Sequence, residues 1–367
     1  MDARHLDSLI RLLAAADTRR RVLALLATVP LLGGLPGALA PDDAAAARKR
    51  KAPVAAQRRH GGRKHKHKHK HKTCTPQTTA QTCAGRCGNV TNNCQQPVAC
   101  PSTCANPTPV CANTTCVACE RNSQCASGAI CDGGQCAACD VCPGGSCAFT
   151  SVQAAINATP LLSTIHVCPG TYLEQAGPTG AVQIARALRL VGAGSGENDA
   201  RSTILKPAQS DVPVVLVGSA QGVTLQGLRI TGGTGANGRG AQIYDSRVDL
   251  NGCIIAQNVT DAPGGGFSIA VAGTQVTLTD TLVIGNTGNS AGGVDVQGAG
   301  SSLTLDALSR ITGNTATGGN GGIRAIPNTS VTLPDANNVT NNTSFGAEKT
   351  CGGGGSFTGP GAVCTTT

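Results

Sequence analysis

The chain has 367 residues, of which 49 are glycine and 19 are cysteine, and only 2% are aromatic. This length leaves room for two or three domains. So few large side chains fit a slender repeat structure better than one large globular core. Residues 1–72 hold 17 Lys/Arg against 5 Asp/Glu, whereas the rest of the chain holds 12 against 15. The near-neutral remainder lacks tryptophan, which argues against nucleic acid as a partner, because such grooves need a basic surface and usually stacking aromatics.

Residues 1–40 have the features of an export signal. Arg19, Arg20 and Arg21 precede an apolar run from Val22 to Leu32, and small residues follow as far as Ala40. A positive flank, a short apolar centre and an Ala-x-Ala-like end are typical of secretory signals. The adjacent arginines resemble the twin-arginine type. A short buried helix is the alternative, but the run is too short to span a bilayer. We therefore expect an exported bacterial protein with no transmembrane span in its mature form.

A basic linker over residues 41–73 ends in alternating lysine and histidine from Lys64 to Lys72. It has nothing to bury, so it should be disordered. One reading is a cationic tether to anionic cell-wall polymer, glycan or lipid head groups. The other is weak binding of zinc, copper or nickel, because alternate side chains of an extended chain share one side. The candidate metal ligands are His65, His67, His69 and His71.

Residues 74–147 form a cysteine-rich segment that holds fifteen of the 19 cysteines. Spacings such as Cys116-x2-Cys119 would suit zinc, but the segment has no histidine and follows an export signal. In an oxidising compartment this pattern favours disulfides that staple a segment lacking an adequate core. The run from Cys119 to Cys136 resembles the small knottin-like or growth-factor-like modules of secreted proteins. That resemblance implies adhesion or spacing.

A short amphipathic helix is predicted from Thr150 to Ile156, where a capping residue precedes an apolar face. It would cover the open edge of the first coil of a repeat domain over residues 148–345. We expect a disulfide between Cys147 and Cys168, since the two residues bracket this helix. Closing a loop of about 20 residues should stabilise the fold by roughly 3 kcal/mol.

Two strand-like markers recur with one period in the repeat domain. The first is Val223-Thr-Leu225, Val248-Asp-Leu250, Val276-Thr-Leu278, Leu303-Thr-Leu305 and Val331-Thr-Leu333, at intervals of 25, 28, 27 and 28 residues. The second is Gly240-Ala-Gln-Ile243, Gly266-Phe-Ser-Ile269, Gly293-Val-Asp-Val296 and Gly322-Ile-Arg-Ala325, whose glycines step by 26, 27 and 29. Two independent markers with one period predict a solenoid. Alternation of apolar and polar residues within each marker predicts strands with one face in the core.

Stacking equivalent positions gives an all-β, single-stranded parallel β-helix, which we expect to be right-handed. The Val or Leu that opens each first marker should form one interior row and the Leu that closes it another, with the central residue outside. Asn258, Asn286 and Asn314 should stack as a ladder in a turn. One cysteine of the 19 cannot pair, and Cys253, an interior position of a regular coil, is the candidate for a remaining thiol.

The segment Ile165-His-Val-Cys-Pro-Gly-Thr-Tyr172, followed by Leu188 to Gly194, resembles the opening of secreted bacterial β-helix proteins of the pectate-lyase-like superfamily. The Asn and Gly-Gly-aliphatic repeats, such as Asn286 with Gly292-Gly293-Val294, are similar to those of polymorphic outer-membrane adhesins. The resemblance covers roughly residues 148–345. It implies the fold, and it implies either adhesion or action on acidic polysaccharides. Residues 346–367 form a glycine-rich tail with the cysteine pair Cys351 and Cys364, unlike a translocator barrel.

Enzymes of this fold use clustered carboxylates and a basic side chain against an acidic glycan. Asp295 and Arg324 are the weak catalytic candidates, because they follow their Gly-Gly pairs at one register. The structural reading of the pair is an exposed cross-strand ion pair contributing roughly 0.2–1 kcal/mol. We expect a secreted or cell-surface adhesion, interaction or structural protein without a cofactor. The alternative is a polysaccharide lyase or hydrolase.

Overall fold

A computed structural model describes residues 74–101, 110–175, 177–196, 201–344, 347–348 and 351–360. The predicted export signal with Arg19 and Arg20, the basic linker with its four histidines, and Cys364 lie outside these residues. All helices and strands described below belong to one compact unit, which begins at Thr78.

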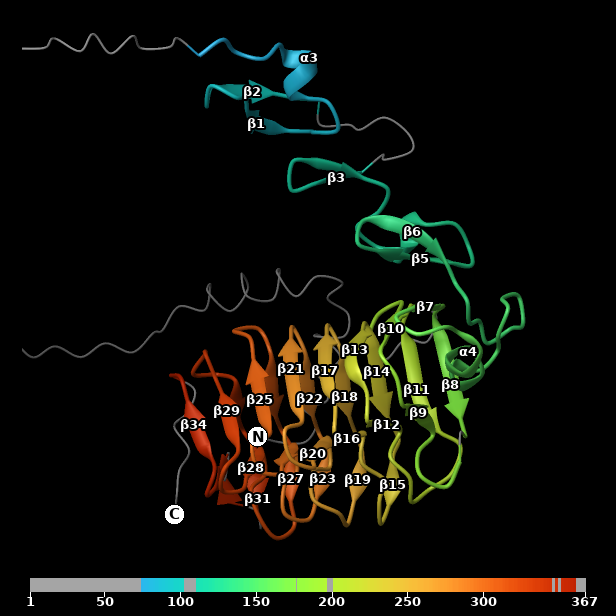
Figure 1. Ribbon diagram of the computed structural model, residues 1–367, viewed down its shortest axis with the longest axis vertical. Helices are drawn as coiled ribbons and strands as arrows, with labels where there is room; N and C mark the ends of the chain where they lie inside the picture. The colour runs from blue at the N-terminus through green and yellow to red at the C-terminus, as the bar shows by residue number, and fades with distance from the viewer. Residues whose placement is uncertain are drawn as a thin grey trace, which may run out of the picture. The chain divides into compact units, whose positions relative to one another are not determined.

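The cysteine-rich segment consists of small antiparallel hairpins held by disulfides (Figure 1). Its elements are α3 (Thr79–Thr82), β1 (Asn89–Thr91), β2 (Pro97–Ala99), β3 (Val110–Ala112), β4 (Thr115–Val117), η1 (Asn122–Gln124), β5 (Ala129–Asp132) and β6 (Gln135–Ala138). Its disulfides include Cys83–Cys100, Cys87–Cys111, Cys119–Cys131, Cys125–Cys136 and Cys142–Cys147. Cys74, Cys94 and Cys116 are disulfide-bonded as well. The expectation of disulfide staples is therefore confirmed for this segment.

The rest of the unit is a parallel β-solenoid, and Figure 1 shows its strands stacked side by side. Sheet 1 consists of β7 (Thr164–Val167), β10 (Leu188–Gly192), β13 (Gln221–Gln226), β17 (Arg247–Asn251), β21 (Gln275–Thr279), β25 (Ser302–Leu305), β29 (Ser330–Thr332) and β34 (Ser356–Thr358). Sheet 2 consists of β8 (Gly170–Glu174), β11 (Thr203–Pro207), β14 (Leu228–Thr231), β18 (Ile254–Ala256), β22 (Leu282–Ile284), β26 (Arg310–Thr312) and β30 (Val339–Thr340).

Two further sheets complete the solenoid. Sheet 3 consists of the short strands β15 (Thr234–Gly235), β19 (Val259–Thr260), β23 (Thr287–Gly288), β27 (Thr315–Ala316) and β31 (Thr343–Ser344), with β32 (Ala347–Glu348) antiparallel at its end. Sheet 4 consists of β9 (Val182–Ile184), β12 (Val215–Gly218), β16 (Ala241–Tyr244), β20 (Phe267–Ala270), β24 (Val294–Val296), β28 (Ile323–Ala325) and β33 (Cys351–Gly353). The predicted parallel solenoid is confirmed, and its right-handed sense stays a prediction.

The rows predicted from the first marker lie in register on sheet 1. Val223 pairs with Val248, and the row continues through Val276, Leu303 and Val331. These side chains are at most 1% exposed. The residues between the two apolar positions face outward, as the alternation predicts. Hydrogen-bonding groups along each inner strand find partners in the coils on both sides, at a spacing of about 4.8 Å.

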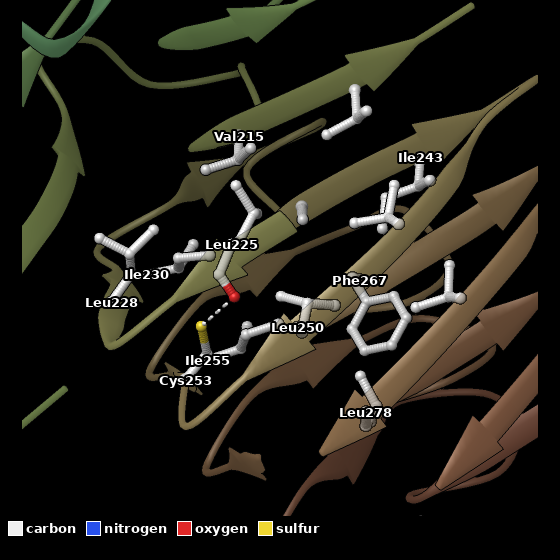
Figure 2. Close-up of a cluster of buried hydrophobic side chains, with 14 of the residues drawn as sticks. Val215, Leu225, Leu228, Ile230, Ile243, Leu250, Cys253, Ile255, Phe267 and Leu278 are labelled. Carbon is white, nitrogen blue, oxygen red and sulfur yellow. Dashed lines mark hydrogen bonds between the residues drawn. The ribbon is translucent and has the colours of Figure 1, made fainter. Parts of the chain in front are cut away.

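The core is a column of aliphatic side chains with few aromatic ones (Figure 2). Phe267 is its largest fully buried side chain. Cys253 is a buried thiol, as predicted, and its Sγ lies 3.3 Å from the carbonyl oxygen of Leu225, to which it donates a hydrogen bond. This thiol occupies an interior position among Leu225, Leu250 and Ile255 and behaves as a small apolar residue.

The predicted asparagine ladder lies between sheets 2 and 3 and is completely buried. Asn258 Nδ2 donates to Asn286 Oδ1 at 3.0 Å, and Asn286 donates likewise to Asn314. The ladder has a fourth member, Asn342, which the sequence analysis missed. The Oδ1 atoms of Asn286, Asn314 and Asn342 also accept from the backbone N–H of the asparagine in the preceding coil, and Asn258 Oδ1 accepts from the backbone N–H of Gly233. The ladder therefore satisfies buried backbone groups at the corner between two sheets.

The first coil is covered by the predicted helix, α4 (Val152–Ala158), whose N-cap is Ser151. Glu174, on β8, is only 2% exposed and accepts hydrogen bonds from Val152 N at 2.6 Å and Ser151 Oγ at 2.8 Å. A carboxylate there satisfies unpaired N–H groups and interacts favourably with the helix dipole. Val141 pairs in parallel with Val167, so the cysteine-rich segment also covers the sheet edge.

The predicted disulfide between Cys147 and Cys168 is wrong. Cys168 bonds to Cys139, and Cys147 bonds to Cys142. The pairing follows from the strand-like contact of Val141 with Val167, which brings the segment around residues 139–142 alongside the end of β7. Cys351 is disulfide-bonded, whereas its predicted partner Cys364 lies outside the described residues.

Candidate functional site

The two catalytic candidates lie together on the outward face of sheet 4. Asp295 on β24 pairs in register with Arg324 on β28, and Gln242 and Ser268 precede them in the same row. This confirms the shared register predicted for Asp295 and Arg324. The register follows from the second marker. Its glycine stands just before the sheet 4 strand in each coil, so the residue two positions after the glycine occupies the same place on every strand.

The ion pair is bidentate. Arg324 Nε donates to Asp295 Oδ1 at 2.6 Å, and Arg324 Nη2 donates to Asp295 Oδ2 at 3.0 Å. Gln297, two residues along β24, donates from its Nε2 to Asp295 Oδ2. Both carboxylate oxygens therefore accept from side chains on the same face. Such planar, paired geometry gives the strongest class of side-chain ion pair.

The expectation that this pair is exposed is wrong, because the Asp295 side chain is 0% exposed and Arg324 is 28% exposed. The connection between β19 and β20 lies against the aspartate at Gly264. Gly264, in that connection, has a positive φ of 77°, and a Cβ added there would lie 3.1 Å from the Cβ of Asp295. Glycine thus permits the close approach of this backbone.

A second arginine, which the sequence analysis did not single out, joins the group. Arg239 is 8% exposed, and its Nη1 donates to Ser268 Oγ at 2.7 Å. Burial lowers the pKa of Arg239, and the charge of Asp295 acts in the opposite direction. The hydrogen bond to Asp295 raises the pKa of Arg324. We call Arg239, Ser268, Asp295, Gln297 and Arg324 the sheet 4 ion cluster.

The hydrogen bonds that the Asp295 carboxylate already accepts limit the chemistry that this cluster can perform. A general acid or base must reach the proton of a substrate within about 2.6–3.2 Å. Asp295 is buried and accepts from Arg324 and Gln297 on both oxygens. Its negative charge balances two buried or half-buried arginines. The cluster therefore has the geometry of a structural ion network.

A second polar cluster joins the cysteine-rich segment to the first coils. Asp132, on β5, accepts from both terminal nitrogens of Arg189, with Nη2 to Oδ1 at 2.6 Å, and lies 3.0 Å from His166 Nε2. The hydrogen bond from Arg189 is the main cause that lowers the pKa of Asp132 to about 2. Arg189 Nη2 also donates to Gln226 Oε1 at 2.7 Å. His166, which lies between the buried residues Ile165 and Val167 on β7, thus takes part in docking the hairpin.

Two groups of cysteines place three sulfur atoms within 4.8 Å of one another, as metal ligands do. They are Cys119, Cys125 and Cys136, and Cys142, Cys147 and Cys168. All six sulfurs are in disulfides. A disulfide sulfur is not the thiolate that binds zinc, so these groups are staples in this state.

No family model, curated protein or solved structure matches this chain. Within the residues that the structure describes, no helix has the length and apolar character needed to cross a membrane.

Proposed function

We propose that this chain is an exported, non-enzymatic interaction protein of the bacterial cell surface. The solenoid displays its outer faces, the cysteine-rich segment is a spacer fixed to its first coils, and the basic linker is a tether. The likeness to pectate-lyase-like proteins and to adhesin repeats, seen in the sequence, belongs to this proposal. The disulfides support a location outside the reducing cytoplasm.

The observation that carries the proposal is the burial of Asp295 in its ion pair. Asp295 is the candidate catalytic carboxylate of the alternative function, a polysaccharide lyase or hydrolase. Glycan hydrolysis needs a pair of accessible carboxylates. With both oxygens accepting from neighbouring side chains, Asp295 supports the architecture of the coil stack. The adhesion reading is therefore the stronger of the two.

The tether makes a separate prediction. If residues 48–72 hold the protein to anionic wall polymer by charge, retention on purified walls should fall at least about tenfold between low salt and roughly 0.5 M NaCl. Deleting the segment should remove retention at low salt as well. The measurement is the bound fraction of full-length and deleted protein after sedimentation with walls.

The matched control replaces His65, His67, His69 and His71 by glutamine and keeps every lysine. The tether reading predicts unchanged, salt-sensitive retention for this variant. Retention that ignores salt, requires zinc or copper and disappears in the histidine variant would contradict it, and would show metal binding instead.

A further inference from the structure

A cavity of about 300 Å³ opens on the outer face of sheet 4, on the first three coils. Its lining includes Thr179, Asp211, Leu216, Asn237, Gln242 and Tyr244. Leu216, Gln242 and Tyr244 project from β12 and β16, and the others come from the connections that lead into sheet 4. The cavity is separate from the sheet 4 ion cluster but lies in the same outward row, since Gln242 pairs with Ser268.

The cavity exists because the first coils depart from the regular repeat. In the two coils that contain β9 and β12, the chain passes from sheet 2 to sheet 4 without a described strand in sheet 3, and connecting loops take its place. These two connections, residues 175–181 and 208–214, are shorter than residues 232–240 and 257–266, which make the same passage in the next two coils. Pro178 and Thr179, Asp211 and Pro213, and Asn237 come from three successive connections and line this cavity.

Two glycines leave room for the side chains of Tyr244 and Asp211, which line the cavity. A Cβ at Gly218 would lie 2.2 Å from the Tyr244 ring, so only glycine lets the ring lie against β12. A Cβ at Gly235 would lie 2.2 Å from Asp211 Oδ1. Asp211 Oδ1 instead accepts from Ala236 N at 2.7 Å, and its Oδ2 accepts from Ser210 Oγ at 3.0 Å. The ring and the carboxylate are therefore held in place before any ligand arrives.

The polar side chains of the lining keep their hydrogen-bonding capacity. Among the described residues, the side chains of Thr179, Asn237, Gln242 and Tyr244 form no hydrogen bond to the protein. Together they offer amide and hydroxyl donors and acceptors. Leu216, 9% exposed, and the tyrosine ring supply apolar surface beside them. An apolar surface with a few convergent polar groups is the usual composition of a small-ligand site.

We propose that this cavity binds one uncharged pyranose unit of a glycan. A pyranose has an apolar C–H face that packs on an aromatic ring, and hydroxyls that pair with amide, hydroxyl and carboxylate groups. The volume is at the lower end of the range of roughly 300–1,000 Å³ for ligand sites, which suits one sugar unit. Asp211, the charged residue of the lining, disfavours a uronate through like-charge repulsion. This inference rests on the proposed surface-interaction function and names its ligand class.

The test is binding of the full-length protein to arrayed oligomers of glucose, galactose, mannose and N-acetylglucosamine, with oligouronates as the anionic set. Salt at about 0.3 M suppresses attachment through the basic linker. We expect binding to at least one uncharged oligomer, and at least about tenfold weaker binding for Tyr244→Ala and for Gln242→Ala. Gln275→Ala, an exposed position on sheet 1, is the matched control and should bind as the wild type does. Far-UV circular dichroism verifies that each variant is folded.

Asp211→Asn gives a second readout. Asparagine keeps an acceptor for Ala236 N and tolerates the positive φ of 65° at this position. Its loss of charge should raise oligouronate binding relative to the uncharged oligomer by about tenfold. Binding of no uncharged oligomer, or binding that Tyr244→Ala and Gln242→Ala leave intact, would overturn the sugar cavity. Release of reducing ends from an arrayed glycan would overturn the non-enzymatic function instead, so the two failures are distinct.

Discussion

Asp295→Asn should lower the free energy of unfolding by about 3 kcal/mol. Removing one partner of a buried ion pair costs roughly 3–5 kcal/mol, because the other charge stays behind without compensation. The lower end applies here, since Arg324 is 28% exposed and water can reach it. Arg239, 8% exposed, loses the nearby negative charge as well. Urea denaturation followed by far-UV circular dichroism measures the change.

Asp249→Asn is the matched control. Asp249 also faces outward on a solenoid strand, on sheet 1, but it forms no side-chain hydrogen bond with the described residues. Its substitution should change stability by no more than about 0.5 kcal/mol. If Asp295→Asn is as mild as the control, the ion cluster is not structural. The double variant Asp295→Asn with Arg324→Met should be less unstable than the sum of the single changes.

Asn286→Ala should lower the free energy of unfolding by about 3–5 kcal/mol. The change removes the acceptor of Asn258 N and Asn258 Nδ2, and the donor to Ile255 O and Asn314 Oδ1. These groups are buried, and each polar group left without a partner costs about 1–3 kcal/mol. The loss should appear as a lower urea midpoint, and as faster amide exchange in the coils that flank Asn286.

Asn251→Ala is the control that distinguishes loss of the ladder's hydrogen bonds from the effect of replacing any asparagine. Asn251 lies on the outer face of sheet 1, half-buried, and its side chain forms no hydrogen bond with the described part of the chain. Its substitution should have little effect on stability. Equal stability of Asn286→Ala and Asn251→Ala would show that the buried hydrogen bonds of the ladder contribute nothing net.

Much of the solenoid could be predicted because two markers keep one period. That period placed Val223 over Val248, and it placed Asp295 beside Arg324 at the correct register. Alternation gives the direction of a side chain relative to its own strand. It says nothing about a connection that lies against the outer face, so the burial of Asp295 beside the connection at Gly264 was missed.

Other features depend on contacts that spacing along the chain does not encode. Arg239 stands just before the repeated glycine, outside the strand pattern, and reaches a serine one coil away. Gln297 could have been found, since it shares the face of Asp295 two residues along the same strand. The Cys139–Cys168 disulfide depends on the pairing of Val141 with Val167, which joins two segments of unrelated pattern.

The most direct test of the non-enzymatic account is a reducing-end and unsaturated-product assay on polyuronides and uncharged polysaccharides. Wild-type protein and Asp295→Asn are incubated with each polymer beside a protein-free control, under conditions in which both proteins are folded. The account predicts that neither protein releases product above the control, since Asp295 is buried and both of its oxygens accept from neighbouring side chains. Product release by the wild type that disappears in the folded Asp295→Asn variant would contradict it and identify Asp295 as catalytic.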